Sequence, residues 1–269
     1  SLTVSGNATM ANKNDDGNYT CLHNAYLTMD NEADVFTVGG NLITAYYNRG
    51  YTKCSAGTLK VGENWINYAD AYFETFEGSG NFTVVMTGTG NVTIDGRGTI
   101  EIPVLKIENA ANRNITMRGT VYTGSLIGGN AFVTATKTPV LHFGKLDGNL
   151  KISGDLTLGL TLKNNNTVSV YGNVFMGSAE DITLSSGSTL NIEGDLIHSN
   201  GMVQPAGGSL KIYGDYRIQS GSDSDGWNNS NGVLKMTNAQ DFVLVGGDFY
   251  TQSSKSHSSY LTAGEMVIY

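Results

Sequence analysis

The chain has 269 residues and a formal net charge of −8 at pH 7, and only 15% of its residues are charged, against about 25% in an average domain. Its 16 Lys and Arg residues form no basic run, which argues against nucleic acid as a partner. No apolar run approaches the ~20 residues that a membrane-spanning helix needs, so we expect no membrane insertion in this segment. The 35 Gly and 3 Pro residues exclude collagen and polyproline linkers and favour short strands joined by tight turns.

A short motif recurs along the chain, with the pattern apolar-x-apolar-x-Gly-(Asp/Asn)-apolar. Its copies are LTVSGNA from Leu2, FTVGGNL from Phe36, a degenerate LKVGENW from Leu59, LKISGDL from Leu150, VSVYGNV from Val168, LNIEGDL from Leu190, LKIYGDY from Leu210 and VLVGGDF from Val243. Successive copies start 34, 23, 91, 18, 22, 20 and 33 residues apart, and the short spacings are close to the ~20 residues of one solenoid coil. Each copy alternates apolar and polar residues, as a half-buried strand does.

The motif spacing therefore predicts an all-β fold, a single-stranded β-solenoid (β-helix) with coils of about 20 residues. The longer spacings of 34 and 33 residues predict coils that carry an extra loop or hairpin. No segment has a sustained 3.6-residue apolar period, so we expect almost no helix.

A longer repeat lies above the short one. The segment 2–61 aligns with the segment 210–268 at an offset of 208 residues, which becomes 207 after one deletion. We therefore expect one continuous solenoid over residues 1–269, made of a repeat unit at 1–208 and the start of a second unit at 209–269. Since the chain begins and ends inside repeat motifs, we expect it to be a section of a longer protein.

The first predicted coils contain the two cysteines, Cys21 and Cys54. They lie 19 and 18 residues after the first two motif starts, so stacking those motifs would place them on successive coils. Strands about 4.8 Å apart fall within the Cα separation that a disulfide needs. The alternatives are a disulfide or two buried thiols in an apolar ladder.

A crowded group of aromatic residues follows in the same part of the chain. The predicted ligand-binding residues are Tyr46, Tyr47, Tyr51, Trp65, Tyr68 and Tyr72. Tyr and Trp are favoured recognition groups because they bury a large area at low entropic cost. The alternative is that these rings fill a wide coil or shield a strand edge.

The remaining chain offers little chemistry. Residues 82–130 lack the Gly-Asp pattern but are expected to form strands. The acidic trio Asp30, Glu32 and Asp34 keeps only its last member in the second copy, as Asp241, which favours a turn-capping role over catalysis. The four histidines have no zinc-site spacing, so we expect no metal and no cofactor.

The second unit carries the strongest family resemblance. VLKMTNAQDFVLVGGDFYTQSSKSHSSYLTAG from Val233, FEGSGNFTVVMTGTGNVTI from Phe76 and LKIEN from Leu105 resemble repeat units of large secreted or surface β-solenoid proteins of anaerobic Gram-positive bacteria. Where that family usually has His, this sequence has Phe82. The resemblance implies an extracellular, adhesin-like array, secreted or at the bacterial cell surface, and it assigns no activity to single residues.

These observations predict a non-enzymatic, adhesin-like module that binds a host protein, for example an immunoglobulin, or a glycan. The alternative is a structural stalk or spacer without a ligand, and a β-helical polysaccharide-acting enzyme is less favoured. Residues 93–98, TIDGRG, resemble a segment of polygalacturonase-type hydrolases, but the catalytic motifs of that family are not found in order. Exposed strand edges at the solenoid ends predict end-to-end self-association as well.

Overall fold

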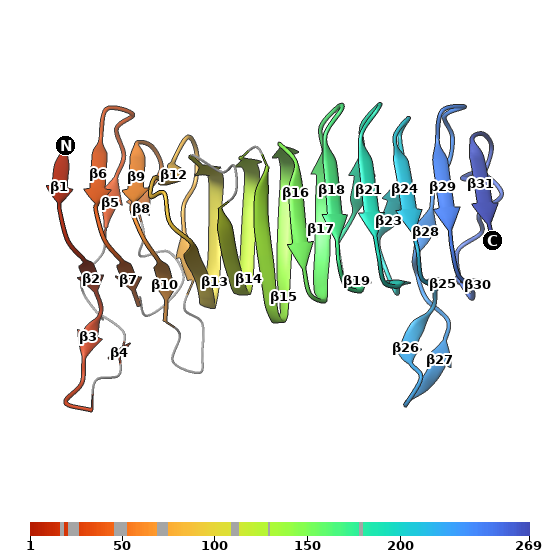
Figure 1. Ribbon diagram of the computed structural model, residues 1–269, viewed down its shortest axis with the longest axis horizontal. Helices are drawn as coiled ribbons and strands as arrows, with labels where there is room; N and C mark the ends of the chain where they lie inside the picture. Colours follow the sequence, from red (N-terminus) through yellow and green to blue (C-terminus); the bar gives the residue numbers. More distant parts are fainter. Residues whose placement is uncertain are drawn as a thin grey trace. The chain divides into compact units, whose positions relative to one another are not determined.

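The computed structural model of the chain describes residues 1–16, 19–20, 27–45, 53–68, 75–108, 113–128, 130–177 and 180–269. These residues form strands and turns and contain no helix. The chain divides into two compact units, Ser1–Val140 and Leu141–Tyr269, whose strands follow one another in Figure 1. The prediction of an all-β chain is confirmed.

The first unit is built from short strands followed by two long ones. Its strands are β1 (Leu2–Val4), β2 (Ala8–Met10), β3 (Asn12–Lys13), β4 (Tyr19–Thr20), β5 (Thr28–Met29), β6 (Val35–Val38), β7 (Leu42–Thr44), β8 (Lys53–Cys54), β9 (Thr58–Val61), β10 (Trp65–Asn67), β11 (Thr75–Glu77), β12 (Thr83–Met86), β13 (Val92–Ile107) and β14 (Asn114–Ile127), and β15 (Ala131–Asp147) begins in it. Strand β13 pairs in parallel with β10, β11 and β12 in turn. The region without the Gly-Asp pattern is therefore strand-like, as predicted.

The second unit repeats three short strands in each coil. Its strands are β16 (Leu150–Ser153), β17 (Leu156–Leu162), β18 (Thr167–Val170), β19 (Val174–Met176), β20 (Ile182–Leu184), β21 (Thr189–Ile192), β22 (Leu196–His198), β23 (Met202–Gln204), β24 (Ser209–Ile212), β25 (Tyr216–Ile218), β26 (Ser220–Ser222), β27 (Gly226–Asn228), β28 (Val233–Leu234), β29 (Phe242–Val245), β30 (Phe249–Thr251) and β31 (Glu265–Ile268). The predicted repeat boundary between residues 208 and 209 lies inside this unit, where Ser209 pairs with Thr189.

Parallel pairing between equivalent motif positions defines the fold. In the first unit β1 pairs with β6 and β6 with β9, and in the second unit β24 pairs with β29 and β29 with β31. The fold is a β-solenoid of about 10 turns with coils of roughly 22 residues, which confirms the predicted fold class. Alternation of side chains along each strand sends one set inward, and these apolar side chains form fully buried ladders such as Val168, Leu190 and Leu210.

The Gly-(Asp/Asn) corner of the motif has a second function besides turning the chain. In the second unit the side-chain oxygen of each Asx residue accepts the backbone N–H of the Asx residue on the next coil, at 2.8–2.9 Å from Asp155 through Asn173, Asp195 and Asp215 to Asp248. Asn7, Asn41 and Asn64 form the same ladder in the first unit. Because a side chain completes backbone hydrogen bonds that a corner would leave open, the motif requires Asp or Asn at this position.

The two longest coils each carry an antiparallel hairpin. Strands β3 and β4 pair in the first unit, and strands β26 and β27 pair in the second. Figure 1 shows each hairpin projecting away from the strands that stack in its own unit. The 34- and 33-residue spacings therefore reflect inserted hairpins, and the prediction of loop-bearing coils is confirmed.

Asp241 caps a turn, as the comparison of repeat copies predicted. It is 2% exposed, and its carboxylate accepts the backbone N–H groups of Gly207 at 2.6 Å, Thr237 at 2.8 Å and Asn238 at 2.9 Å. Its counterpart Asp34 accepts the N–H of Asn31 at 3.3 Å. Both carboxylates therefore serve the backbone of their turns.

No helix in the described part of the chain is long and apolar enough to span a membrane.

Candidate ligand-binding surface

The predicted aromatic group is only partly within the described residues. Tyr46, Tyr47, Tyr51 and Tyr72 lie outside them. Trp65 has no exposed surface, packs edge-on against Phe76 with ring centroids 4.8 Å apart, and donates its indole N–H to Thr44 Oγ1 at 3.3 Å. A side chain without exposed surface cannot contact a ligand, so the prediction of Trp65 as a binding residue is wrong and the core alternative holds for it.

The position of Trp65 follows from the corner that precedes it. Asn64 occupies the Asx position of the degenerate motif, and the apolar residue after each Asx turns inward. Leu42 and Leu196 fill the same position in other copies and are fully buried. Strand alternation then places Ile66 outward and Asn67 inward.

Tyr68 is half-buried and lies in a cation–aromatic contact. Its ring centroid is 5.1 Å from that of Tyr19 on the hairpin strand β4, and the Arg97 guanidinium lies 4.6 Å from the Tyr68 ring. Arg97 also pairs with Asp95, with Nε and Oδ2 3.1 Å apart. Tyr68 is therefore the one predicted binding residue in the described part of the chain that keeps exposed surface.

Cys54 is a buried free thiol in the structure, while Cys21 lies outside the described residues. Cys54 pairs with Met29 on the preceding coil, and its Sγ lies 3.7 Å from the Leu27 carbonyl oxygen. The hairpin inserted before β5 moves Met29 to the position that equal coil lengths would give to Cys21. Burial raises the pKa of the Cys54 thiol to about 12, so this thiol is unreactive at neutral pH.

The second unit contains an aromatic and charged cluster that sequence reasoning missed. Arg217, on β25, lies between two rings: its guanidinium carbon is 4.7 Å from the Trp227 ring centroid and 3.9 Å from that of Tyr250. Trp227 belongs to the hairpin strand β27 and Tyr250 to β30 on the following coil. A guanidinium stacked on both faces has lost most of its freedom, and such cation–π contacts contribute about 0.5–1 kcal/mol each where solvent is near.

Three carboxylates hold the groups of this cluster in place. Arg217 Nη2 lies 2.7 Å from Asp215 Oδ2, the Tyr250 hydroxyl donates to Asp248 Oδ2 at 2.7 Å, and the Trp227 indole N–H donates to Asp223 Oδ1 at 2.9 Å. The hydrogen bond to Asp248 raises the pKa of the Tyr250 hydroxyl. We name Asp215, Arg217, Trp227, Asp248 and Tyr250 the arginine cluster. Its rings are preorganised yet keep exposed surface, which suits recognition of a ligand.

A signal for the arginine cluster exists in the repeat comparison. Trp227 aligns with Tyr19, so both hairpins carry an aromatic residue at the same position, but Arg217 and Tyr250 align with Thr9 and Ile43. Outward positions that differ between copies, next to a hairpin aromatic that both copies share, indicate where the units differ in function.

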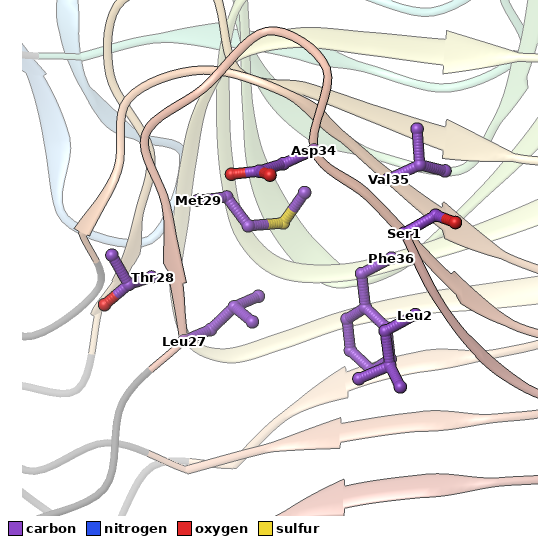
Figure 2. Close-up of a pocket in the computed structure, with 8 residues that line it drawn as sticks. All are labelled: Ser1, Leu2, Leu27, Thr28, Met29, Asp34, Val35 and Phe36. Atoms are coloured by element: carbon purple, nitrogen blue, oxygen red, sulfur yellow. The ribbon is translucent and has the colours of Figure 1, made fainter.

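Two hollows in the first unit lack this combination of groups. One, of about 320 Å³, lies beside β1 and is lined by Ser1, Leu2, Leu27, Thr28, Met29, Asp34, Val35 and Phe36. Figure 2 shows apolar side chains around most of it, with the Asp34 carboxylate as its charged group. The other, of about 470 Å³, is lined by Gly39, Gly62, Glu63, Asn64, Gly88, Thr89, Gly90, Asn91 and Val92. Among their lining residues neither hollow has a basic or nucleophilic group beside its carboxylate.

Among the described residues, no group of three or more His, Cys, Asp or Glu side chains is placed to hold a metal ion. Of the four histidines, His198 is fully buried, and its Nδ1 lies 3.0 Å from the Tyr216 hydroxyl and its Nε2 3.0 Å from the Gly201 carbonyl.

No protein-family model, no curated protein and no solved structure that was compared matches the chain. The fold and the arginine cluster therefore rest on the chain's own sequence and geometry.

Proposed function

We propose that this chain is an adhesin-like binding module of a secreted or cell-surface bacterial protein, and that it binds a host protein or a glycan through the arginine cluster. The observation that carries the proposal is the stacking of Arg217 between the partly exposed rings of Trp227 and Tyr250. The family resemblance of the repeat units supports the bacterial surface as the setting.

The solenoid itself does not need these side chains. The equivalent positions in the first repeat copy are Thr9, Tyr19 and Ile43, and the Asx ladder is complete in both copies. Ordering an arginine and two aromatic rings at the surface costs conformational entropy without adding to the core. A ligand that buries the rings and hydrogen-bonds the carboxylates would offset this cost.

The same geometry favours binding over catalysis. Asp215 and Asp248 lie on successive coils, but Asp215 already accepts the Asp248 backbone N–H and contacts Arg217, and Asp248 accepts the Tyr250 hydroxyl. A pair of acid–base carboxylates would instead have lone pairs directed at a substrate between them.

We expect Trp227→Ala and Tyr250→Ala to weaken binding roughly 30-fold or more, as hot-spot aromatics do. The full chain would be immobilised and screened against a glycan array and host secretory proteins, including immunoglobulins, followed by titration of each hit. The control Ile127→Ala removes an apolar side chain that is 40% exposed on β14 and is expected to bind as the unmodified chain does. Tyr68→Ala tests the site near the first hairpin.

Hits that survive both substitutions in folded protein would contradict the arginine cluster as the site. If only Tyr68→Ala weakens them, the site lies near the first hairpin. A folded chain that binds nothing in either screen would favour the spacer function, which the uninterrupted Asx ladders also support because they stiffen the coil stack.

A further inference from the structure

One corner of the second unit carries exposed tyrosines at a regular interval. Parallel pairing aligns Val170, Ile192, Ile212, Val245 and Ile268 on successive coils. The next residue of each coil donates its backbone N–H to the preceding coil, at 2.7–3.0 Å. Those next residues, in order, are Tyr171, Glu193, Tyr213, Gly246 and Tyr269. A tyrosine therefore occupies this corner on every second coil.

All three rings face solvent. Tyr171 is 48% exposed, Tyr213 is 50% exposed and Tyr269 is 83% exposed. We name them the tyrosine row. They precede the Gly-Asx corner of their coils, whereas Arg217 and Tyr250 follow it, so the row is built from different strands than the arginine cluster.

The fold does not require tyrosine at this corner. Ser5, Gly39, Gly62 and Ser153 occupy it in other copies of the motif. Large exposed aromatic side chains at a position that accepts Ser or Gly gain little from packing, because half or more of their surface stays in water. Their recurrence on alternate coils therefore points to a function at the surface.

The interval between the rings is set by the coil stack. Neighbouring strands lie about 4.8 Å apart, so rings on alternate coils lie about 9.6 Å apart. Between them Glu193 presents an exposed carboxylate, and Gly246 presents bare backbone, since a Cβ there would lie 2.6 Å from the Tyr213 carbonyl oxygen. The surface thus alternates a ring with an open or hydrogen-bonding step.

We propose that the tyrosine row binds an extended β-1,4-linked glycan that runs along the coil stack. Alternate sugars of such a chain present the same ring face, and its disaccharide repeat is close in length to two strand spacings. Each tyrosine would stack on every second sugar, because an aromatic face packs against the apolar face of a pyranose ring. Glu193 and the neighbouring outward side chains of Asn191 and Lys211 would hydrogen-bond the hydroxyl groups.

A proline-rich peptide is the main competing ligand. A polyproline II helix repeats every three residues with a rise of about 3.1 Å each, which gives about 9.3 Å, and aromatic rings often line its binding sites. However, a proline ring has no hydrogen-bonding group for the polar side chains beside the row, whereas a sugar has several. The polar surroundings of the row therefore favour the glycan.

The test is isothermal titration of the full chain with β-1,4-linked glucose and N-acetylglucosamine oligosaccharides of two, four and six sugars. We expect affinity to rise with length for at least one series, as further tyrosines are engaged. Tyr171→Ala and Tyr213→Ala should each weaken hexasaccharide binding roughly three- to tenfold, while Ile127→Ala should not. The exchange variant Glu193→Tyr/Tyr213→Glu keeps the composition but places two rings on adjacent coils, and it should lose most of the affinity.

Failure of this proposal is distinct from failure of the proposed function. A folded chain that binds neither hexasaccharide, binding that does not depend on length, or an exchange variant that binds normally would overturn the glycan assignment, as would tighter binding of a proline-rich decapeptide. Trp227→Ala and Tyr250→Ala should leave oligosaccharide binding unchanged, and loss of binding in these variants would assign the oligosaccharide to the arginine cluster instead.

Discussion

Replacing Trp65 by alanine is expected to lower the free energy of unfolding of the first unit by about 3–5 kcal/mol, the cost of removing a large buried aromatic side chain. The indole has no exposed surface and contacts the Phe76 ring, and its N–H reaches Thr44 Oγ1. The truncation leaves a cavity between stacked coils and an inward hydroxyl with one contact fewer. Urea denaturation followed by circular dichroism measures the effect.

The matched control is Tyr68→Ala, three residues further along the chain. Tyr68 keeps exposed surface, so its removal is expected to cost about 1 kcal/mol or less. The two substitutions therefore separate a core residue from a surface residue in the same coil. If Trp65→Ala kept the stability of the unmodified chain but lost ligand binding, Trp65 would be a binding residue after all.

The second expected result is a loss of stability in acid that depends on His198. Burial lowers the pKa of this imidazole to about 4, whereas an unfolded histidine titrates near 6.5. A carbonyl oxygen only accepts, so Nε2 carries the proton that is donated to Gly201, and Nδ1 accepts from the Tyr216 hydroxyl. The folded state thus holds a neutral imidazole whose two nitrogens are both satisfied.

The direction of the pH effect follows from proton binding. Above pH 6.5 both states are neutral at this site and contribute no difference. Between pH 6.5 and about 4 the unfolded state binds a proton that the folded state does not, so the free energy of unfolding falls as the pH falls. The total loss from this one group is on the order of 3 kcal/mol.

Comparison of variants isolates the histidine from the carboxylates that also titrate in acid. His198→Gln keeps one donor for Gly201 and one acceptor for Tyr216 but cannot be protonated. Its free energy of unfolding should decrease less than that of the unmodified chain between pH 7 and pH 4. His142→Gln, at a half-buried position, should follow the unmodified chain. Parallel pH profiles for the unmodified chain and His198→Gln would contradict the assignment.

The candidate sites show where sequence reasoning succeeded and where it failed. Density of aromatic residues along the chain directed attention to residues 46–76, yet Trp65 is in the core. The motif already contained the reason, because Trp65 occupies the apolar position after the Asx corner. Asp241 was predicted correctly, since a carboxylate kept between repeat copies while its acidic neighbours change indicates a structural role.

The sequence by itself determined the fold class, the strands that pair and the coils that carry a hairpin. It did so because the two-residue alternation and the Gly-Asx corner are local constraints that repeat in phase, and stacking equal phases leaves one register that buries the apolar ladder. Only the tertiary structure decided which outward residues meet. Arg217 lies 10 residues from Trp227 and 33 from Tyr250 in the chain, and Tyr171 lies 98 residues from Tyr269. Their neighbours in space depend on the length of every intervening coil, and one inserted hairpin, as at Cys54 and Met29, is enough to change the pairing.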